Sequence, residues 1–183
     1  MKYSIQTVKD HYDSGSSLDY LFFWGHHTKP GKVTKACFSQ WFPACFVVDE
    51  ASYNCAEQYM MAEKARVFGD DDILQKILAC EAPQEIKALG RLVKDFDSDI
   101  WNDVAQDIVV KGNLHKFMQN PDLCQYLLGT ERKVLVEASP YDTIWGIGMK
   151  ESDAGIEDPY KWKGLNLLGF ALMEVRDKLN ETA

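Results

Sequence analysis

Apolar residues recur at helical spacing almost without interruption between residues 54 and 128. Pro83 and Pro121 stand where the first turn of a helix tolerates proline, because that position makes no intrahelical use of an amide N–H. The pattern predicts helices over residues 57–68, 71–80, 83–93, 99–118 and 121–128. A last helix is predicted over residues 166–179, where apolar residues again form one stripe.

Short apolar runs outside these helices predict strands. Residues 20–24 and 45–49 are rich in aromatic and β-branched side chains, and residues 133–137 alternate between polar and apolar positions. The predicted fold class is therefore mainly α with a few short β-strands, an α+β arrangement. A chain of 183 residues fits one domain over residues 1–183, which would bury roughly 70% of the surface of the unfolded chain.

The segment between the strand at 133–137 and the last helix is a long loop for a compact domain. Loops beyond about 12 residues are usually either functional or disordered. Trp145 and Trp162 lie in this segment, and two large aromatic residues favour a functional loop.

The charge balance limits the partners that the chain can bind. The formal net charge is −8, whereas tight duplex binding draws on many Lys and Arg contacts to phosphate. A local cationic pocket for one or two phosphates remains compatible with this charge. The sequence shows no apolar leader segment and no run of about 18 apolar residues, so we expect a cytoplasmic protein that has no membrane partner.

The cysteines and histidines do not predict a metal centre. Five cysteines form an odd set without a C-x-x-C pair, which argues against a disulfide framework and against a zinc site. No Asp, Glu or Cys stands at a ligand spacing beside the histidines. We expect no metal and no other cofactor. A nucleophile pair of Cys55 and His115 has no local support, because buried free cysteine is commonplace.

Glu57 and Lys64 are candidates for chemistry because they are seven residues apart on one predicted helix. At 3.6 residues per turn they share a face, displaced by roughly 10 Å along the axis, so their long side chains could converge on one ligand. An ordinary alternative is a capping box, in which Glu57 reaches back to the amide of Asn54. From the pattern alone, capping is the better explanation.

Asp142 precedes a pair of glycines, Gly146 and Gly148, by a few residues. Its ordinary role would be a turn, in which the carboxylate accepts a hydrogen bond from a nearby backbone amide. The glycines could let backbone amides approach a ligand phosphate, although a lone Gly-x-Gly is weak evidence for that. Both interpretations stay open at this point.

Aromatic side chains offer flat surfaces on which a sugar or a nucleobase would stack. Trp101 stands three residues before Val104 and seven before Ile108, which is the spacing of a buried helix stripe and favours the core. The other aromatic residues that could line a site are Phe23, Trp24, Trp41, Trp145 and Trp162.

Two segments of the chain make it resemble a known family. Residues 54–64 (NCAEQYMMAEK) and 136–148 (VEASPYDTIWGIG) are similar to the signature segments of the YbiA-like, or NADAR, family. Further blocks resemble the family in the same order: residues 22–25, 38–41, 89–91, 96–97 with Trp101, 112–117 and 166–176. The resemblance covers a core of about residues 21–179, and residues 1–19 and 150–163 fall outside its strongest blocks.

The resemblance implies a helix-dominated fold and hydrolysis of N-glycosidic bonds to ribose phosphates. It implies two substrate classes: phosphoribosylamino-pyrimidine intermediates of riboflavin synthesis, and ADP-ribose attached to guanine in nucleotides or single-stranded DNA. It places catalytic residues at Glu57, Lys64 and Asp142, and a pocket wall at Trp101. The other residues that the matched blocks implicate in substrate binding are Phe23, Trp24, Gly25, Ser39, Gln40, Trp41, Arg91, Trp145, Gly146, Gly148 and Asn166.

Cleavage of a C1′–N bond builds positive charge on the ribose and negative charge on the departing nitrogen. We expect Glu57 to stabilise the ribose charge or orient water, and Asp142 to hold ribose hydroxyls or transfer a proton. Alternatively, Lys64 attacks the ring-opened sugar and forms a Schiff base. A non-catalytic module that binds ADP-ribose or a nucleotide is the main competing function, and a protein-interaction domain ranks last.

Overall fold

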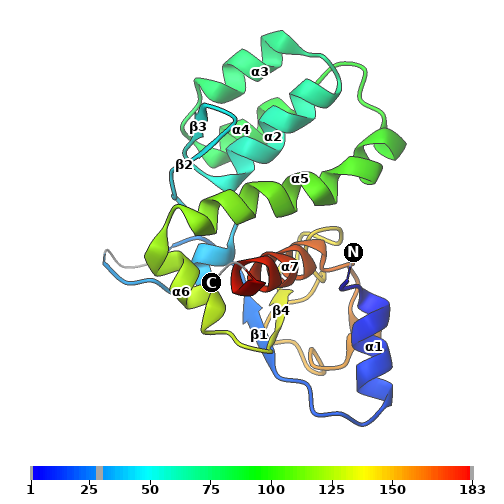
Figure 1. Cartoon of the computed structure of the whole chain (residues 1–183). Coiled ribbons are helices and arrows are strands. Elements are labelled where there is room, and N and C mark those ends of the chain that lie inside the picture. Colours follow the sequence, from blue (N-terminus) through cyan, green and yellow to red (C-terminus); the bar gives the residue numbers. More distant parts are fainter. Residues whose placement is uncertain (1, 28–30, 182–183) are drawn as a thin grey trace. The chain divides into compact units, whose positions relative to one another are not determined.

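The computed structural model describes residues 2–27 and 31–181 (Figure 1). The helices are α1 (Ile5–Asp13), α2 (Ala56–Val67), α3 (Asp71–Leu78), α4 (Pro83–Gly90), α5 (Ser98–Met118), α6 (Pro121–Leu128) and α7 (Leu167–Glu181). The strands are β1 (Tyr20–Phe23), β2 (Phe46–Val48), β3 (Ala51–Tyr53) and β4 (Val134–Glu137), and two 3₁₀ helices are η1 (Lys35–Phe38) and η2 (Pro159–Lys161). The chain divides into two compact units, residues 1–39 with 122–183 and residues 40–121.

The first unit is built around a parallel pair of strands. β1 pairs with β4 in register from Tyr20 opposite Val134 to Phe23 opposite Glu137. Helix α7 packs on β4 (Figure 1). The approach is close because α7 carries Gly169, where a Cβ atom would lie only 2.1 Å from the carbonyl oxygen of Leu135.

The second unit is built around α2, which packs against α3, α4 and α5. Residues of α2 are buried on nearly all sides from Ala56 to Ala62, which is typical of a central helix. The neighbouring helices approach closely at glycines: a Cβ at Gly112 of α5 would lie 2.3 Å from the ring of Tyr59. An antiparallel hairpin of β2 and β3 packs beside α5 and α2.

The predicted fold class is confirmed, since helices dominate and the strands are few and short. All six predicted helices and three predicted strands are present, with ends shifted by no more than a few residues. The sequence pattern did not predict α1 and β3. Trp101 is buried, as its helical spacing predicted. In the described part of the chain, no helix is both long and apolar enough to cross a membrane.

Candidate active site

Glu57 does not cap its helix in the way that the capping-box pattern predicted. The N-cap of α2 is Cys55, which makes no side-chain capping bond. The amide of Asn54 donates instead to Gln58 Oε1 at 2.8 Å. Gln58 Nε2 in turn donates to the carbonyl oxygens of Ile77 and Cys80. The capping role therefore belongs to Gln58, and that explanation for Glu57 is wrong.

Glu57 is a buried carboxylic acid in the first turn of α2, with 5% of its surface exposed. Its backbone N–H donates to the carbonyl oxygen of Gln40 at 2.9 Å. A carboxylate at this end of a helix is stabilised by the unpaired amides and the positive end of the helix dipole. Glu57 is thus held near protein dipoles and away from bulk water, which strengthens its effect on a nearby positive charge.

Gln40 connects the start of α2 with α5. Asn113 Nδ2 of α5 donates to Gln40 Oε1 at 2.8 Å, and Gln40 Nε2 lies 3.9 Å from Met60 Sδ of α2. All three side chains are buried. Gln40 was expected in the site, and the structure places it beside the first turn of α2 rather than on an open surface.

Lys116 is a buried lysine that the sequence analysis did not single out. It lies on α5 three residues beyond Asn113 and has no exposed surface. Its Nζ is 5.7 Å from the centre of the Phe42 ring and 5.3 Å from that of Phe117. The sequence does place Lys116 on the buried stripe of α5, and this could have marked it as a candidate. A buried ammonium needs compensating groups, so a lysine at such a position is unusual.

Cys55 lies close to both buried charges. Burial raises the pKa of its thiol to about 11, while Glu57 adds to this increase and Lys116 opposes it. The thiol is therefore protonated at neutral pH and a poor nucleophile. This finding adds to the case against Cys55 as a catalytic residue.

Lys64 lies in the last turn of α2, near two aromatic rings and Arg91. Its Nζ donates to the carbonyl oxygen of Gly90 at 2.9 Å and lies 3.9 Å from the Phe96 ring centre and 5.9 Å from that of Trp101. Burial, followed by the neighbouring Arg91, lowers the pKa of Lys64. The structure thus brings together Lys64, Arg91 and Trp101, all of which the sequence analysis had named.

Asp142, in the other compact unit, organises the loop that follows it. Its Oδ1 accepts hydrogen bonds from the amides of Ile144 at 2.9 Å and Trp145 at 2.7 Å, and from Gly146 at 3.5 Å. This is the turn geometry that Asp favours. Its Oδ2 has no hydrogen-bond partner within residues 2–27 and 31–181, so one oxygen remains available to a ligand.

The two glycines after Asp142 serve the loop itself. The amide of Gly148 donates to the Asp142 carbonyl oxygen at 3.0 Å, and the amide of Gly146 points at the Asp142 carboxylate. A Cβ at Gly146 would lie 2.9 Å from the carbonyl oxygen of Glu137. Glycine is needed here for close backbone packing, and the geometry gives no support to a phosphate cradle at these amides.

Trp24 follows β1 and borders a cavity of about 480 Å³, which we call the Trp24 cavity. Its indole is 54% exposed and lies 6.1 Å, centre to centre, from the ring of Tyr141. Gly25 has a φ of +80°, which lets the chain turn directly after the indole. The lining residues are Trp24, Ala138, Lys150, Glu151 and Ser152.

Several predicted binding residues have structural roles. Phe23 is buried and packs edge-to-face on Phe38. Asn166 is buried and hydrogen-bonds the backbone of β4 through both side-chain atoms. Trp145 is half-buried, and its carbonyl oxygen accepts from the amide of Leu168. Ser39 is the C-cap of η1. The ring centre of Trp41 lies 5.9 Å from Lys87 Nζ. Trp162 is buried, and its Nε1 donates to the carbonyl oxygen of Ile156.

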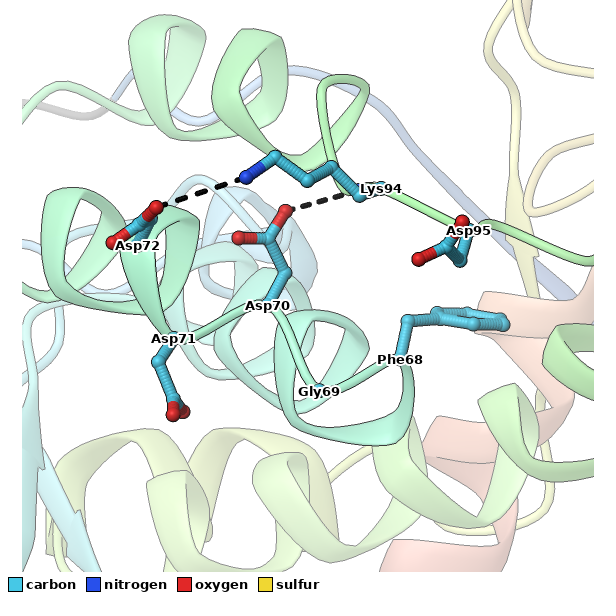
Figure 2. A pocket seen from close by; sticks show the side chains of 7 residues that line it. All are labelled: Phe68, Gly69, Asp70, Asp71, Asp72, Lys94 and Asp95. Carbon is cyan, nitrogen blue, oxygen red and sulfur yellow. Dashed lines mark hydrogen bonds and ion pairs between the residues drawn. The ribbon is translucent and has the colours of Figure 1, made fainter.

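A second cavity, of about 250 Å³, is lined by acidic residues around the start of α3 (Figure 2). Its lining residues are Phe68, Gly69, Asp70, Asp71, Asp72, Lys94 and Asp95. Asp70 accepts hydrogen bonds from the amides of Ile73 and Lys94, and Lys94 Nζ is 3.7 Å from Asp72 Oδ2. These contacts hold the loop before α5 against α3, so the residues that line this cavity have a structural role. Among the residues described, no cluster of His, Cys, Asp and Glu has the make-up of a metal site.

Comparison with known proteins places this geometry in context. The model of the NADAR domain family matches residues 22–180. An N-glycosidase of Acanthamoeba polyphaga mimivirus is 46% identical over 87% of this chain and 95% of its own length. A chloroplastic riboflavin biosynthesis protein of Zea mays is 35% identical over 59% of this chain, which spans only 16% of that protein.

A solved structure has the same fold. The NMR structure of the E. coli protein YbiA superposes with a TM-score of 0.73, over 91% of this chain and 88% of that one, at 26% identity. The residues that match the family model, 22–180, include Glu57, Lys64 and Asp142.

Proposed function

Because the chain belongs to the NADAR domain family, we propose that it hydrolyses the C1′–N bond between a ribose phosphate or ADP-ribose and a nucleobase-like amine. The family membership and the N-glycosidase relatives make it a hydrolase of N-glycosyl compounds. The observation that supports a catalytic role for Glu57 is that its carboxyl group is buried at the start of α2. The hydrogen bond to the Asn54 amide, which the capping-box pattern assigned to Glu57, is made by Gln58.

The chemistry requires a carboxylate near C1′. As the C–N bond lengthens, the ribose acquires oxocarbenium character, and a fixed negative charge in a poorly solvated place stabilises it more than water would. Glu57 supplies this charge or orients the attacking water. We assign no covalent step to Glu57.

Asp142 and Lys64 receive separate roles. The available Oδ2 of Asp142 suits a hydrogen bond to a ribose hydroxyl or a proton transfer to the leaving amine. Lys64, whose pKa is lowered by burial, suits an alternative route. Its neutral amine would add to C1′ of the ring-opened substrate, the base amine would leave with a proton, and water would then hydrolyse the lysine imine.

Two substrate classes fit the proposal. Relatives named as riboflavin biosynthesis proteins support the phosphoribosylamino-pyrimidine intermediates of that synthesis. ADP-ribosylated guanine has the same kind of bond, a ribose C1′ joined to the nitrogen of a base. The net charge of −8 favours small or single-stranded substrates over long duplexes.

Replacing Glu57 tests the proposal. Glu57→Gln keeps the size of the side chain and removes its charge, so the release of free base should fall about 10²–10⁴-fold. Glu63→Gln is the matched control, because Glu63 lies on the same helix but pairs with Arg66 at the surface. Circular dichroism should show both variants folded. Unchanged turnover in Glu57→Gln would refute the catalytic assignment, and tight ligand binding without turnover by the parent would favour a binding module.

A further inference from the structure

The Trp24 cavity is not used by the proposed bond cleavage, yet it has the size of a ligand site. About 480 Å³ lies within the range of about 300–1,000 Å³ that is usual for small-molecule pockets. All of its lining residues belong to the same compact unit as Asp142. Three of them, residues 150–152, lie in the stretch that resembles the family blocks least.

The indole of Trp24 in the cavity lining can stack a flat ring. Trp24 is 54% exposed, and the 84% exposed ring of Tyr141, which lies outside the lining, is 6.1 Å from it centre to centre and tilted by 54°. Large aromatic side chains that are left exposed together usually mark an interaction surface. Stacking on aromatic side chains is the common way in which proteins hold unpaired bases.

An exposed carboxylate borders the same cavity. Lys35 Nζ donates to both oxygens of Glu151, at 2.9 and 2.7 Å. An ionised carboxylate has about four acceptor positions, so each oxygen of Glu151 can accept a further hydrogen bond. Lys150 adds a positive charge to the lining, which suits a phosphorylated ligand.

We propose that the Trp24 cavity binds a nucleobase-like ring, with the ring stacked on the indole and Glu151 accepting hydrogen bonds from neighbouring ring N–H and amino groups. Such an edge occurs in guanine and in 2-amino-4-oxopyrimidines, and adenine, cytosine and uracil lack it. The inference rests on the proposed function for the reaction, but base binding itself does not require turnover. It would give this unit of the chain a preference for guanine and 2-amino-4-oxopyrimidines over other nucleobases.

Binding measurements with two nucleotides test this assignment. Guanosine and inosine monophosphate differ only in the 2-amino group, and calorimetric titration of the full chain measures their affinities without catalysis. The parent should prefer the guanosine nucleotide about tenfold or more, because a two-point hydrogen-bonded match is worth at least that factor. Glu151→Gln should reduce the preference to less than about twofold.

Two further variants control the experiment. Glu157→Gln makes the same charge change at an exposed position in the same stretch, outside the cavity lining, and should keep the preference. Trp24→Leu should weaken both nucleotides alike, by roughly 5–100-fold, since stacking does not read the amino group.

The outcomes separate the two proposals. Equal affinity of the parent for both nucleotides, no binding of either, or a preference that survives in Glu151→Gln would overturn the base assignment. Preferential binding by a protein that never releases base would contradict the proposed reaction and leave the base assignment standing. Release of base by a protein that binds both nucleotides equally would support the proposed reaction and contradict the base assignment.

Discussion

Charged side chains held away from bulk water are the main chemical feature at the scale of single residues. Glu57 and Lys116 are buried, and Lys64 is half-buried between rings. Burial of an ionised group costs free energy unless other groups compensate it. Gln58 holds the backbone before α2, and Asn113 holds Gln40 beside the first turn of that helix, so hydrogen bonds fix the surroundings of Glu57.

The Schiff-base route through Lys64 gives a prediction at this scale. Borohydride added during turnover should reduce a lysine imine to a stable adduct, which mass spectrometry would locate on residue 64. Because the pKa of Lys64 is lowered, a larger fraction of its amine is neutral at a given pH than in an ordinary lysine. The adduct yield should therefore rise with pH and reach its half-maximum below the ordinary lysine value.

Lys64→Arg should abolish the adduct, since a guanidinium forms no imine under these conditions. Lys111→Arg is the control, because Lys111 forms an ion pair with Asp49 at the surface that arginine can keep. Repeated absence of an adduct in the parent under turnover conditions would remove the Lys64 route and leave the route through Glu57 and water.

At the scale of elements, Asn166 joins β4 to the start of α7. Its Oδ1 accepts from the amide of Glu137, and its Nδ2 donates to the carbonyl oxygen of Leu135, both at 2.9 Å. Its φ of +56° lies in the left-handed region, which asparagine tolerates better than most residues. One residue therefore satisfies two backbone groups and turns the chain into the helix.

Asn166→Ala should lower the free energy of unfolding by about 3–8 kcal/mol. One buried and one partly buried backbone group would lose their partners at about 1–3 kcal/mol each, and alanine adds about 1–2 kcal/mol of strain at positive φ. Urea unfolding followed by circular dichroism measures the change as a lower midpoint.

Asn166→Gly separates the two causes, because glycine removes the hydrogen bonds but relieves the strain. It should be less destabilised than Asn166→Ala by about 1 kcal/mol. A midpoint for Asn166→Ala equal to that of the parent would show that these hydrogen bonds do not hold β4 to α7.

For the whole molecule, the long helical patterns in the sequence predicted most of the fold. α1 escaped prediction because it has only nine residues and buries only Val8, so the three apolar residues at helical spacing, Ile5, Val8 and Tyr12, make too short a pattern. β3 has three residues, too few for an alternating pattern to be recognised. α4 ends at Gly90, earlier than predicted, where a Cβ would collide with Met61 of α2.

The candidate site was predicted less completely than the fold. The capping-box spacing placed the start of α2 at Asn54, but the helix begins after Cys55, so Gln58 and not Glu57 meets the free amide. A one-residue shift of this kind depends on tertiary contacts. Local pattern also does not reveal the burial of Lys116. The Trp24 cavity is formed by segments that are distant in sequence, residue 24 and residues 150–152, so local pattern does not reveal it either.

Product analysis of the unaltered protein tests the central claim most directly. The chain would be incubated in ¹⁸O-labelled water in two parallel reactions, one with a phosphoribosylamino-pyrimidine and one with ADP-ribosylated guanosine. The products would then be separated, and their masses measured by mass spectrometry. The account predicts free base from at least one substrate, together with a ribose phosphate or ADP-ribose that has gained one ¹⁸O from water. Recovery of both substrates intact, even when they bind tightly, would contradict it.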